Sequence, residues 1–247
     1  MKICKTVAEG VNAALAIYQV TPTQTWEYVP AAPGDYTDTL VLDGIKYPLF
    51  WWHCDTQISQ MYRMAPSRKL CSMKLNRTCA KSMGLDALLY KELDIAEHMF
   101  RCEIQSVMAM ENEHSMNMLA TMEQQQVALF ELAATLNDNT PEQGRHSYWG
   151  EDGMASDRVV SQKIPSEAIY LFTEDEKDPT LYNDIFIYMY GLSKTDVLKA
   201  TTIAEILMGR RDCSNWIEKD AHYRRCIAAA HLSNQLVKCV NIQEVSL

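Results

Sequence analysis

The stretch that decides the fold is "LDALLYKELDIAEHMFRCEIQSVMAMENEHSMNMLATMEQQQVALFELAATLN", from Leu85 to Asn137, which contains neither glycine nor proline. Apolar residues recur along it in steps of three or four, on average about 3.6 residues apart, which is the period of an α-helix. Only His114 and Gln125 interrupt this stripe. Its apolar members are Leu89, Leu93, Ala96, Phe100, Ile104, Val107, Met110, Met118, Met122, Leu129, Leu132 and Leu136.

A single helix over this stretch would be longer than the protein is wide. At 1.5 Å per residue it would extend about 80 Å, whereas a compact domain of this size has a diameter of roughly 45 Å. Either the helix breaks without a glycine or proline, or it projects and packs against other copies of the chain. Because no residue here favours a turn, we expect projection, with the apolar stripe packed in a homo-oligomer.

The remaining sequence predicts shorter elements. A first helix should end before Thr21-Pro22, since proline disfavours helix in the preceding residue. Asp43-Gly44, between two short apolar runs, is typical of a β-hairpin turn. Two further helices are expected over Lys194–Met208 and Cys213–Lys238. The predicted fold is mainly α: a helical bundle with one very long central helix and a small N-terminal β-hairpin insertion.

This prediction divides the chain into three parts. Residues 1–137 would hold the first helix, the hairpin, a basic helix and the long helix. Residues 138–158, rich in Gly, Asn and Asp, would form a flexible loop, and residues 159–247 a C-terminal helical region. "RVVSQKI", within the last part, could add a short strand.

A basic segment stands out because the whole chain is acidic, with a formal net charge of −9. No Asp or Glu lies between Thr56 and Leu85. If Ser67–Ser82 were helical, Lys74, Arg77 and Lys81 would share one face. Such a face can contact an acidic protein neighbour or a phosphate backbone. The six cations are Arg63, Arg68, Lys69, Lys74, Arg77 and Lys81.

Catalytic signatures are missing. The sequence holds no GxSxG, no phosphate-binding GxxxxGK[ST], no GxGxxG and no HExxH. Glu111 and His114 have the ExxH spacing that ferritin-like di-iron proteins use on their helices. A second ExxH is absent, so a helical metal-dependent oxidase is an alternative and not the main expectation. We expect no catalytic residues, no metal and no cofactor.

The eight cysteines form no CxxC pair, which favours reduced, mostly buried thiols and a cytoplasmic protein. No run of apolar residues is long enough for a membrane span. "TVAEGVNAALAIYQV" is broken by Glu9 and Asn12, so we interpret it as an amphipathic helix and not as a signal peptide.

Two end segments resemble short-tailed phage head–tail adaptor proteins. "EGVNAALAIYQVTP" is similar to their opening helix, and "KATTIAEILMGRRDCSNWIEKDAHYRRCIAAAH" to their closing helical pair. The matching positions are Val11, Asn12, Leu15, Pro22, Ala204, Leu207, Gly209, Trp216, Ala221, Arg225 and Ala229. The resemblance covers about a fifth of the chain and implies a ring-forming virion component, helical with a β insertion and without enzymatic activity.

The sequence therefore predicts a non-enzymatic assembly protein. Its expected partners are further copies of itself, other assembly or virion proteins, and DNA passing nearby without sequence specificity. A nucleic-acid-binding regulatory protein that uses residues 63–81 is a second alternative.

Overall fold

A computed structural model describes residues 4–64, 70–151, 153–157, 169–173, 180–182 and 191–246. Its α-helices are α1 (Val7–Ile17), α2 (Thr56–Met64), α3 (Leu85–Phe100), α4 (Lys194–Leu207) and α5 (Trp216–Leu236). Short 3₁₀ helices are η1 (Trp51–Cys54), η2 (Lys81–Met83) and η4 (Ile242–Glu244). The described residues divide into two compact units, one within Met1–Ile58 and Asp184–Asp220 and the other within Ser59–Asn183 and Ala221–Leu247. The division expected from the sequence follows chain order, whereas each unit combines two separate segments.

The first unit contains a small antiparallel sheet of β1 (Trp26–Val29), β2 (Thr39–Leu42) and β3 (Ile45–Pro48). The predicted hairpin at Asp43-Gly44 is confirmed, and both turn residues have positive φ angles, 48° and 85°.

Helix α1 packs on α4, and both helices end close to their predicted bounds. A Cβ on Gly10 would lie 2.9 Å from Leu192 Cδ1 and 3.0 Å from Ala200 Cβ, so glycine allows this close packing of α1.

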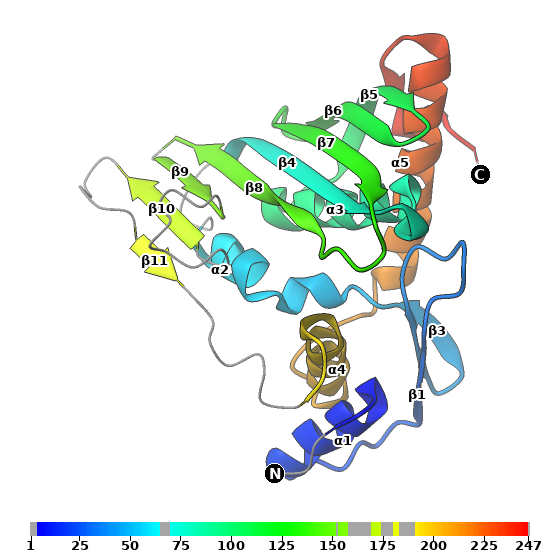
Figure 1. Ribbon diagram of the computed structural model, residues 1–247, viewed down its shortest axis with the longest axis vertical. Helices are drawn as coiled ribbons and strands as arrows, with labels where there is room; N and C mark the ends of the chain where they lie inside the picture. Colours follow the sequence, from blue (N-terminus) through cyan, green and yellow to red (C-terminus); the bar gives the residue numbers. More distant parts are fainter. Residues whose placement is uncertain are drawn as a thin grey trace. The chain divides into compact units, whose positions relative to one another are not determined.

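The second unit is built on a nine-stranded mixed sheet in the order β11-β10-β9-β8-β4-β7-β6-β5-β12 (Figure 1). Only β4 and β7 pair in parallel among the strand pairs of the described residues. The strands are β4 (Leu70–Ala80), β5 (Ile104–Asn112), β6 (Ser115–Met122), β7 (Val127–Leu136), β8 (Gln143–Gly150), β9 (Gly153–Ser156), β10 (Ile169–Thr173), β11 (Thr180–Tyr182) and β12 (Val240–Asn241).

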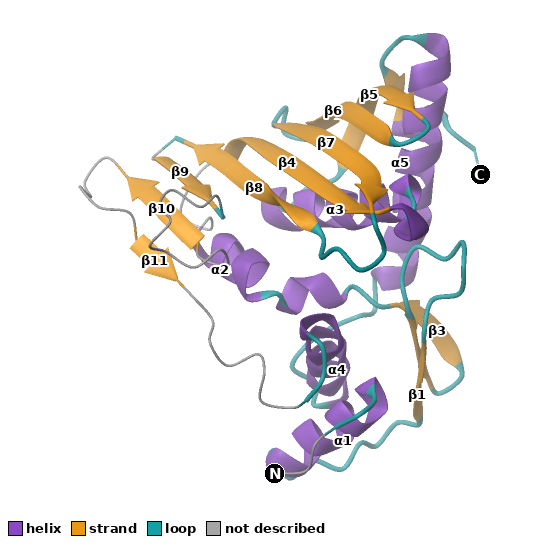
Figure 2. Cartoon of the chain, viewed as in Figure 1, coloured by secondary structure: helices purple, strands orange, loops and turns teal. Residues whose placement is uncertain are grey.

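Helix α3 packs against β4, β6 and β7, and Figure 2 shows it lying across one face of the sheet. Alternate residues of β7 point toward this covered face: Ala128, Phe130, Leu132 and Ala134 are buried. The residues between them are half-buried or exposed. This period of two is that of a sheet with one covered and one open face.

The structure overturns the long helix and the mainly α fold class. The stretch from Leu85 to Asn137 forms one helix of 16 residues, α3, followed by the three strands β5, β6 and β7. It doubles back at Arg101 and Gln125, two non-glycine residues with φ angles of 59° and 65°. The fold is α/β, so a rod that projects to other subunits does not exist.

Two other local predictions are also wrong. Instead of the expected basic helix over Ser67–Ser82, residues 70–80 form strand β4 and Lys81 begins η2, whereas Arg63 lies in α2. Arg68 and Lys69 lie outside the described residues. The expected loop over 138–158 contains β8 and β9. "RVVSQKI" also lies outside the described residues.

Candidate functional site

Helix α3 buries three carboxylates. Glu92 and Asp94 are 0% exposed and Glu97 is 6% exposed. Acidic side chains are almost never fully buried unless they are paired, because an isolated charge loses its hydration. The partners of these three residues therefore define the chemistry of this unit.

Glu92 pairs with a buried histidine of the sheet. His146, on β8, places Nε2 2.8 Å from Glu92 Oε2 and Nδ1 3.3 Å from Asp157 Oδ2. The backbone N–H of His146 donates to Asp157 Oδ1 at 2.6 Å. The imidazole is thus held at both ring nitrogens by carboxylates, which fixes the orientation of the ring and favours a proton on each nitrogen.

Two cations complete this network. Arg77, on β4, places Nη2 3.2 Å from both ring nitrogens of His146, and its Nε lies 3.4 Å from Glu92 and 3.2 Å from Glu142. Lys91 Nζ donates to both oxygens of Glu142, at 2.9 and 3.0 Å. Three carboxylates face two permanent cations, so the network is neutral when His146 is protonated.

The pKa values agree with this charge count. Burial alone would lower the pKa of His146, but the charge of Glu92 and the hydrogen bonds that the ring donates to Glu92 and Asp157 outweigh it, and the pKa rises to about 8. Burial alone would raise the pKa of Glu92, yet the charges of His146 and Arg77 lower it to about 2. The buried pair is an imidazolium and a carboxylate at neutral pH.

Asp94 and Glu97 face α5 instead. The hydroxyl of Tyr223 donates to Asp94 Oδ1 at 2.9 Å, and His222 Nε2 lies 2.7 Å from Glu97 Oε1. Glu97 also accepts the backbone N–H of Ile104 at 2.8 Å, and Cys226 Sγ lies 3.5 Å from His222 Nε2. Burial raises the pKa of Tyr223 well above its usual value, and the charges of Asp94 and Glu97 raise it further.

Accessibility separates the two histidines. His146 is fully enclosed, so it can position β8 and α3 but cannot touch a substrate from its described position. His222 is 9% exposed. An imidazole held by a carboxylate is the usual form of a general base, because the carboxylate orients the ring and stabilises its cation. The candidate functional site is therefore the group formed by Asp94, Glu97, His222 and Tyr223.

A third cluster lies at the start of α3. His231, on α5, contacts Glu111 of β5 through Nδ1 at 2.9 Å and Asp86 of α3 through Nε2 at 3.0 Å. Asn234 exchanges hydrogen bonds with Glu111, donating to its carboxylate and accepting its backbone N–H. Hydrogen bonding to Asp86 raises the pKa of His231 to about 9, with a further contribution from Glu111, although burial alone would lower it.

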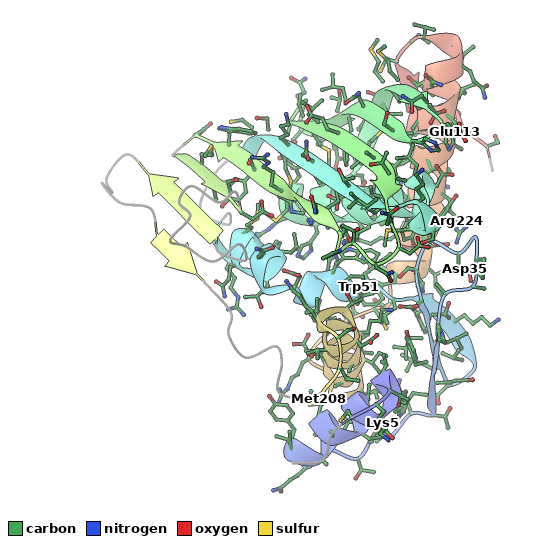
Figure 3. All side chains as sticks on the ribbon, viewed as in Figure 1. Lys5, Asp35, Trp51, Glu113, Met208 and Arg224 are labelled. Atoms are coloured by element: carbon green, nitrogen blue, oxygen red, sulfur yellow. The ribbon has the colours of Figure 1, made fainter. Side chains whose placement is uncertain are left out.

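The alternative metal site at Glu111 and His114 is wrong. The two residues lie on a strand and a turn, not on a helix; His114 is exposed beside Glu113, which is labelled in Figure 3. Glu111 pairs with His231 instead. In the part of the chain that the structure describes, no group of three or more His, Cys, Asp or Glu side chains could hold a metal ion.

The predicted basic residues fall into two groups. Lys74 pairs with Glu131 across β4 and β7 at 2.8 Å, and Arg77 belongs to the buried network, so both find acidic partners in their own chain. Lys74 and Asn76 donate to Glu131, and these hydrogen bonds lower its pKa. Arg63 and Lys81 are exposed, and a contact of these two with an acidic partner stays a prediction.

Most predicted packing residues lie in the core of their own unit. Leu129 and Leu136 are half-buried and Met110 is 66% exposed. The other nine are buried within the chain: Leu89, Leu93, Ala96, Phe100, Ile104, Val107, Met118, Met122 and Leu132.

Two expectations concerned disulfides and membrane spans. All eight cysteines are free. Among the described helices, none combines the length and the hydropathy that crossing a bilayer requires.

Several solved structures similar to this chain are oxidoreductases. An oxidoreductase from Agrobacterium radiobacter in complex with NAD+, L-tartaric acid and magnesium superposes with a TM-score of 0.61 at 12% identity, over 78% of this chain and 64% of its own. An oxidoreductase domain protein from Kribbella flavida gives 0.60 at 10% identity, with the same coverage. The aldose-aldose oxidoreductase from Caulobacter crescentus, complexed with glycerol, gives 0.58 at 11% identity, over 77% and 62%.

The chain thus spans less than two thirds of the length of these structures. No protein-family model matches the sequence, and no curated protein is similar to it. At these identities the likeness establishes the fold. It overturns the resemblance to phage head–tail adaptors, because the similar structures are oxidoreductases and not helical connectors. With it the expectation of a non-enzymatic virion protein is wrong, and so are the ferritin-like and nucleic-acid-binding alternatives.

Proposed function

We propose that this chain forms the substrate-handling part of an oxidoreductase that acts on an alcohol group of a small polyhydroxylated molecule. The likeness to solved oxidoreductases over more than three quarters of the chain supports this proposal. The molecules and substrate classes in the names of these structures, L-tartaric acid, glycerol and aldoses, carry several hydroxyl groups and favour this substrate class.

The observation that carries the proposal is the pairing of His222 with Glu97 beside Tyr223 and Asp94. Oxidation of an alcohol removes a proton from oxygen and a hydride from carbon, so it needs a base near the hydroxyl. His222 is the proposed proton acceptor, and Glu97 is a positioning residue that orients the ring. Tyr223 stays protonated at neutral pH, and its hydroxyl donates to Asp94 beside this pair.

Substrate binding tests this proposal directly. Titration calorimetry of the full chain with a panel of polyols, hydroxy acids and aldoses should reveal saturable binding of at least one class. His222→Gln should weaken that binding about fivefold, which corresponds to the loss of roughly 1 kcal/mol of hydrogen bonding. His114→Gln, at an exposed histidine of the same unit, should bind as the wild type does.

The proposal is wrong if no member of the panel binds, or if both histidine variants bind as the wild type does. Circular dichroism of each variant separates lost binding from lost folding. A conservative Glu97→Gln variant should keep part of the affinity, because an amide can still accept a hydrogen bond from His222.

The expected homo-oligomer is also part of the proposal. Met110, Leu119 and Trp149 are exposed strand residues on the sheet of the second unit, and Met108 adds to them. Such exposed apolar side chains suit an interface. Mass measurement at several concentrations tests the homo-oligomer, and a monomer at all of them contradicts it.

The free thiols favour a reducing compartment, in agreement with a cytoplasmic protein.

A further inference from the structure

The proposed function needs an acceptor for the hydride, and one of the similar structures holds NAD+. A nicotinamide dinucleotide is bound through its pyrophosphate, which carries two negative charges. The phosphates usually sit on the N-terminus of a helix that follows a parallel strand through a glycine-rich turn, because the free N–H groups and the helix dipole favour anions there. The described residues can be compared with these requirements one by one.

The described part of the sheet offers one place where such a site could form. β4 and β7 are the parallel pair, and β4 is followed by η2, Gly84 and the start of α3. Only one glycine lies in this connection. All nine glycines of the chain are at described positions, and no two of them are separated by a single residue, so GxG does not occur anywhere. A backbone cradle for a pyrophosphate therefore has no glycines from which to form.

The start of α3 is also already occupied by an acid. Asp86 lies in the first turn, where its carboxylate takes the position that favours an anion, and it is fixed there by His231 Nε2 at 3.0 Å. A phosphate bound at this turn would lie next to Asp86, so like charges would repel it.

The other described helices repeat this arrangement. First-turn carboxylates are Glu9 in α1, Asp196 in α4 and Glu218 in α5. In front of α2, Asp55 accepts the backbone N–H of Gln57 at 2.8 Å. Each of the five helix starts in the described part of the chain thus carries a carboxylate of its own. The net charge of −9 adds a general repulsion of anions.

Because the described residues do not meet the requirements of a pyrophosphate site, we infer that the dinucleotide of the proposed oxidoreductase is not held by this chain. Its phosphates need a glycine-rich turn between a parallel strand and a helix, which the described residues lack, and this chain contributes the proton-accepting side of the reaction. The inference rests on the proposed function, since without a hydride transfer no dinucleotide is needed.

Titration of the full chain with NADH and with NADPH, followed by nicotinamide fluorescence and by thermal unfolding, tests the inference. We expect no saturable fluorescence change and no shift in the unfolding temperature at millimolar cofactor, because a ligand that binds only the native state raises that temperature. A dinucleotide-binding dehydrogenase measured in parallel must show both signals. Saturable binding of either cofactor by this chain at micromolar concentrations would overturn the inference.

The same preparation titrated with the polyol panel keeps the two proposals apart. Polyol binding without dinucleotide binding supports both. Dinucleotide binding overturns the inference about the cofactor and leaves the proposed function intact. Absence of polyol binding overturns the proposed function, and with it the need for a dinucleotide.

Discussion

The Nε2 atom of His146 lies 2.8 Å from Oε2 of Glu92, and both side chains are fully enclosed in the second unit. The pair joins β8 to α3 across 54 residues of sequence. Because Asp157, Arg77 and Glu142 add further charges around it, each member depends on the others for its charged form.

Removing one charge of this pair should destabilise the protein strongly. Glu92→Gln leaves His146 and Arg77 buried with too little negative charge, and loss of one partner of a buried pair costs on the order of 3–5 kcal/mol. Urea unfolding measures the change in the free energy of unfolding. Glu123→Gln, at an exposed position, is the control and should stay within about 0.5 kcal/mol of the wild type. Equal effects of the two variants would contradict the buried network.

The pH dependence of stability should follow His146. Its pKa rises from 6.5 to about 8 on folding, so its stabilising contribution is complete below pH 6.5 and is lost as the pH rises through 8. The shift corresponds to roughly 2 kcal/mol. Urea unfolding across pH 6 to 9 should show this loss, and His146→Gln should remove most of it. If His146→Gln loses as much stability between pH 6 and 9 as the wild type does, another group is responsible for the loss.

His231 should add a second loss at higher pH with the same sign. Its pKa rises from 6.5 to about 9, so the stabilisation is complete below pH 6.5 and disappears as the pH passes 9. Since the ring is partly exposed, solvent screening limits the effect to about 1 kcal/mol or less. His231→Gln should therefore be less stable than the wild type at pH 7 and equal to it above about pH 10. A difference that persists at high pH would show that packing, not charge, is responsible.

The contact of α1 with α4 predicts a steric effect. Gly10→Val places a branched side chain where even a Cβ would lie 2.9 Å from Leu192 and 3.0 Å from Ala200. Overpacking of this kind costs about 1–3 kcal/mol, which thermal unfolding can measure. Gly10→Ala should cost less, because alanine favours the helix by about 1 kcal/mol over glycine. Wild-type stability of the valine variant would mean that the two helices can move apart.

The elements that could be predicted from sequence are those bounded by glycine or proline. Helix α1 ends before Pro22, the hairpin turns at Asp43-Gly44, and Gly209 follows α4. The stretch from α3 to β7 has no such residue. Its chain reversals use Arg101 and Gln125 in left-handed conformations and a tight turn at Glu113-His114. Its strands are rich in Met, Ala and Leu, which favour helices in isolation, so tertiary pairing overrides local preference.

A signal of period two was nevertheless present. In "SMNMLATM" of β6, Met116, Met118, Ala120 and Met122 are buried. The intervening positions include Asn117 and Thr121, as in a half-buried strand. The spacing of three or four that favoured a helix arises because apolar residues occupy both faces of β5 and β6, including the exposed Met110 and Leu119.

The candidate site could be anticipated only in part. Around a helix, Asp94 lies about 200° and Glu97 about 140° from Glu92, so the three cannot all face solvent on a packed helix. Their partners could not be predicted, because His146 and His222 lie 54 and 125 residues away in sequence and reach α3 only through the sheet and α5.

The parallel pairing of β4 with β7 also determines the order in which the second unit can assemble. Met73 pairs with Ala128 on one side and with Tyr148 on the other, both more than 50 positions further along the chain. The central strand is therefore synthesised long before either neighbour exists, and closing such distant contacts is slow. A nascent chain that has reached only the β5–β6 hairpin exposes both edges of β4, and this is the stage at which aggregation and chaperone capture compete with folding.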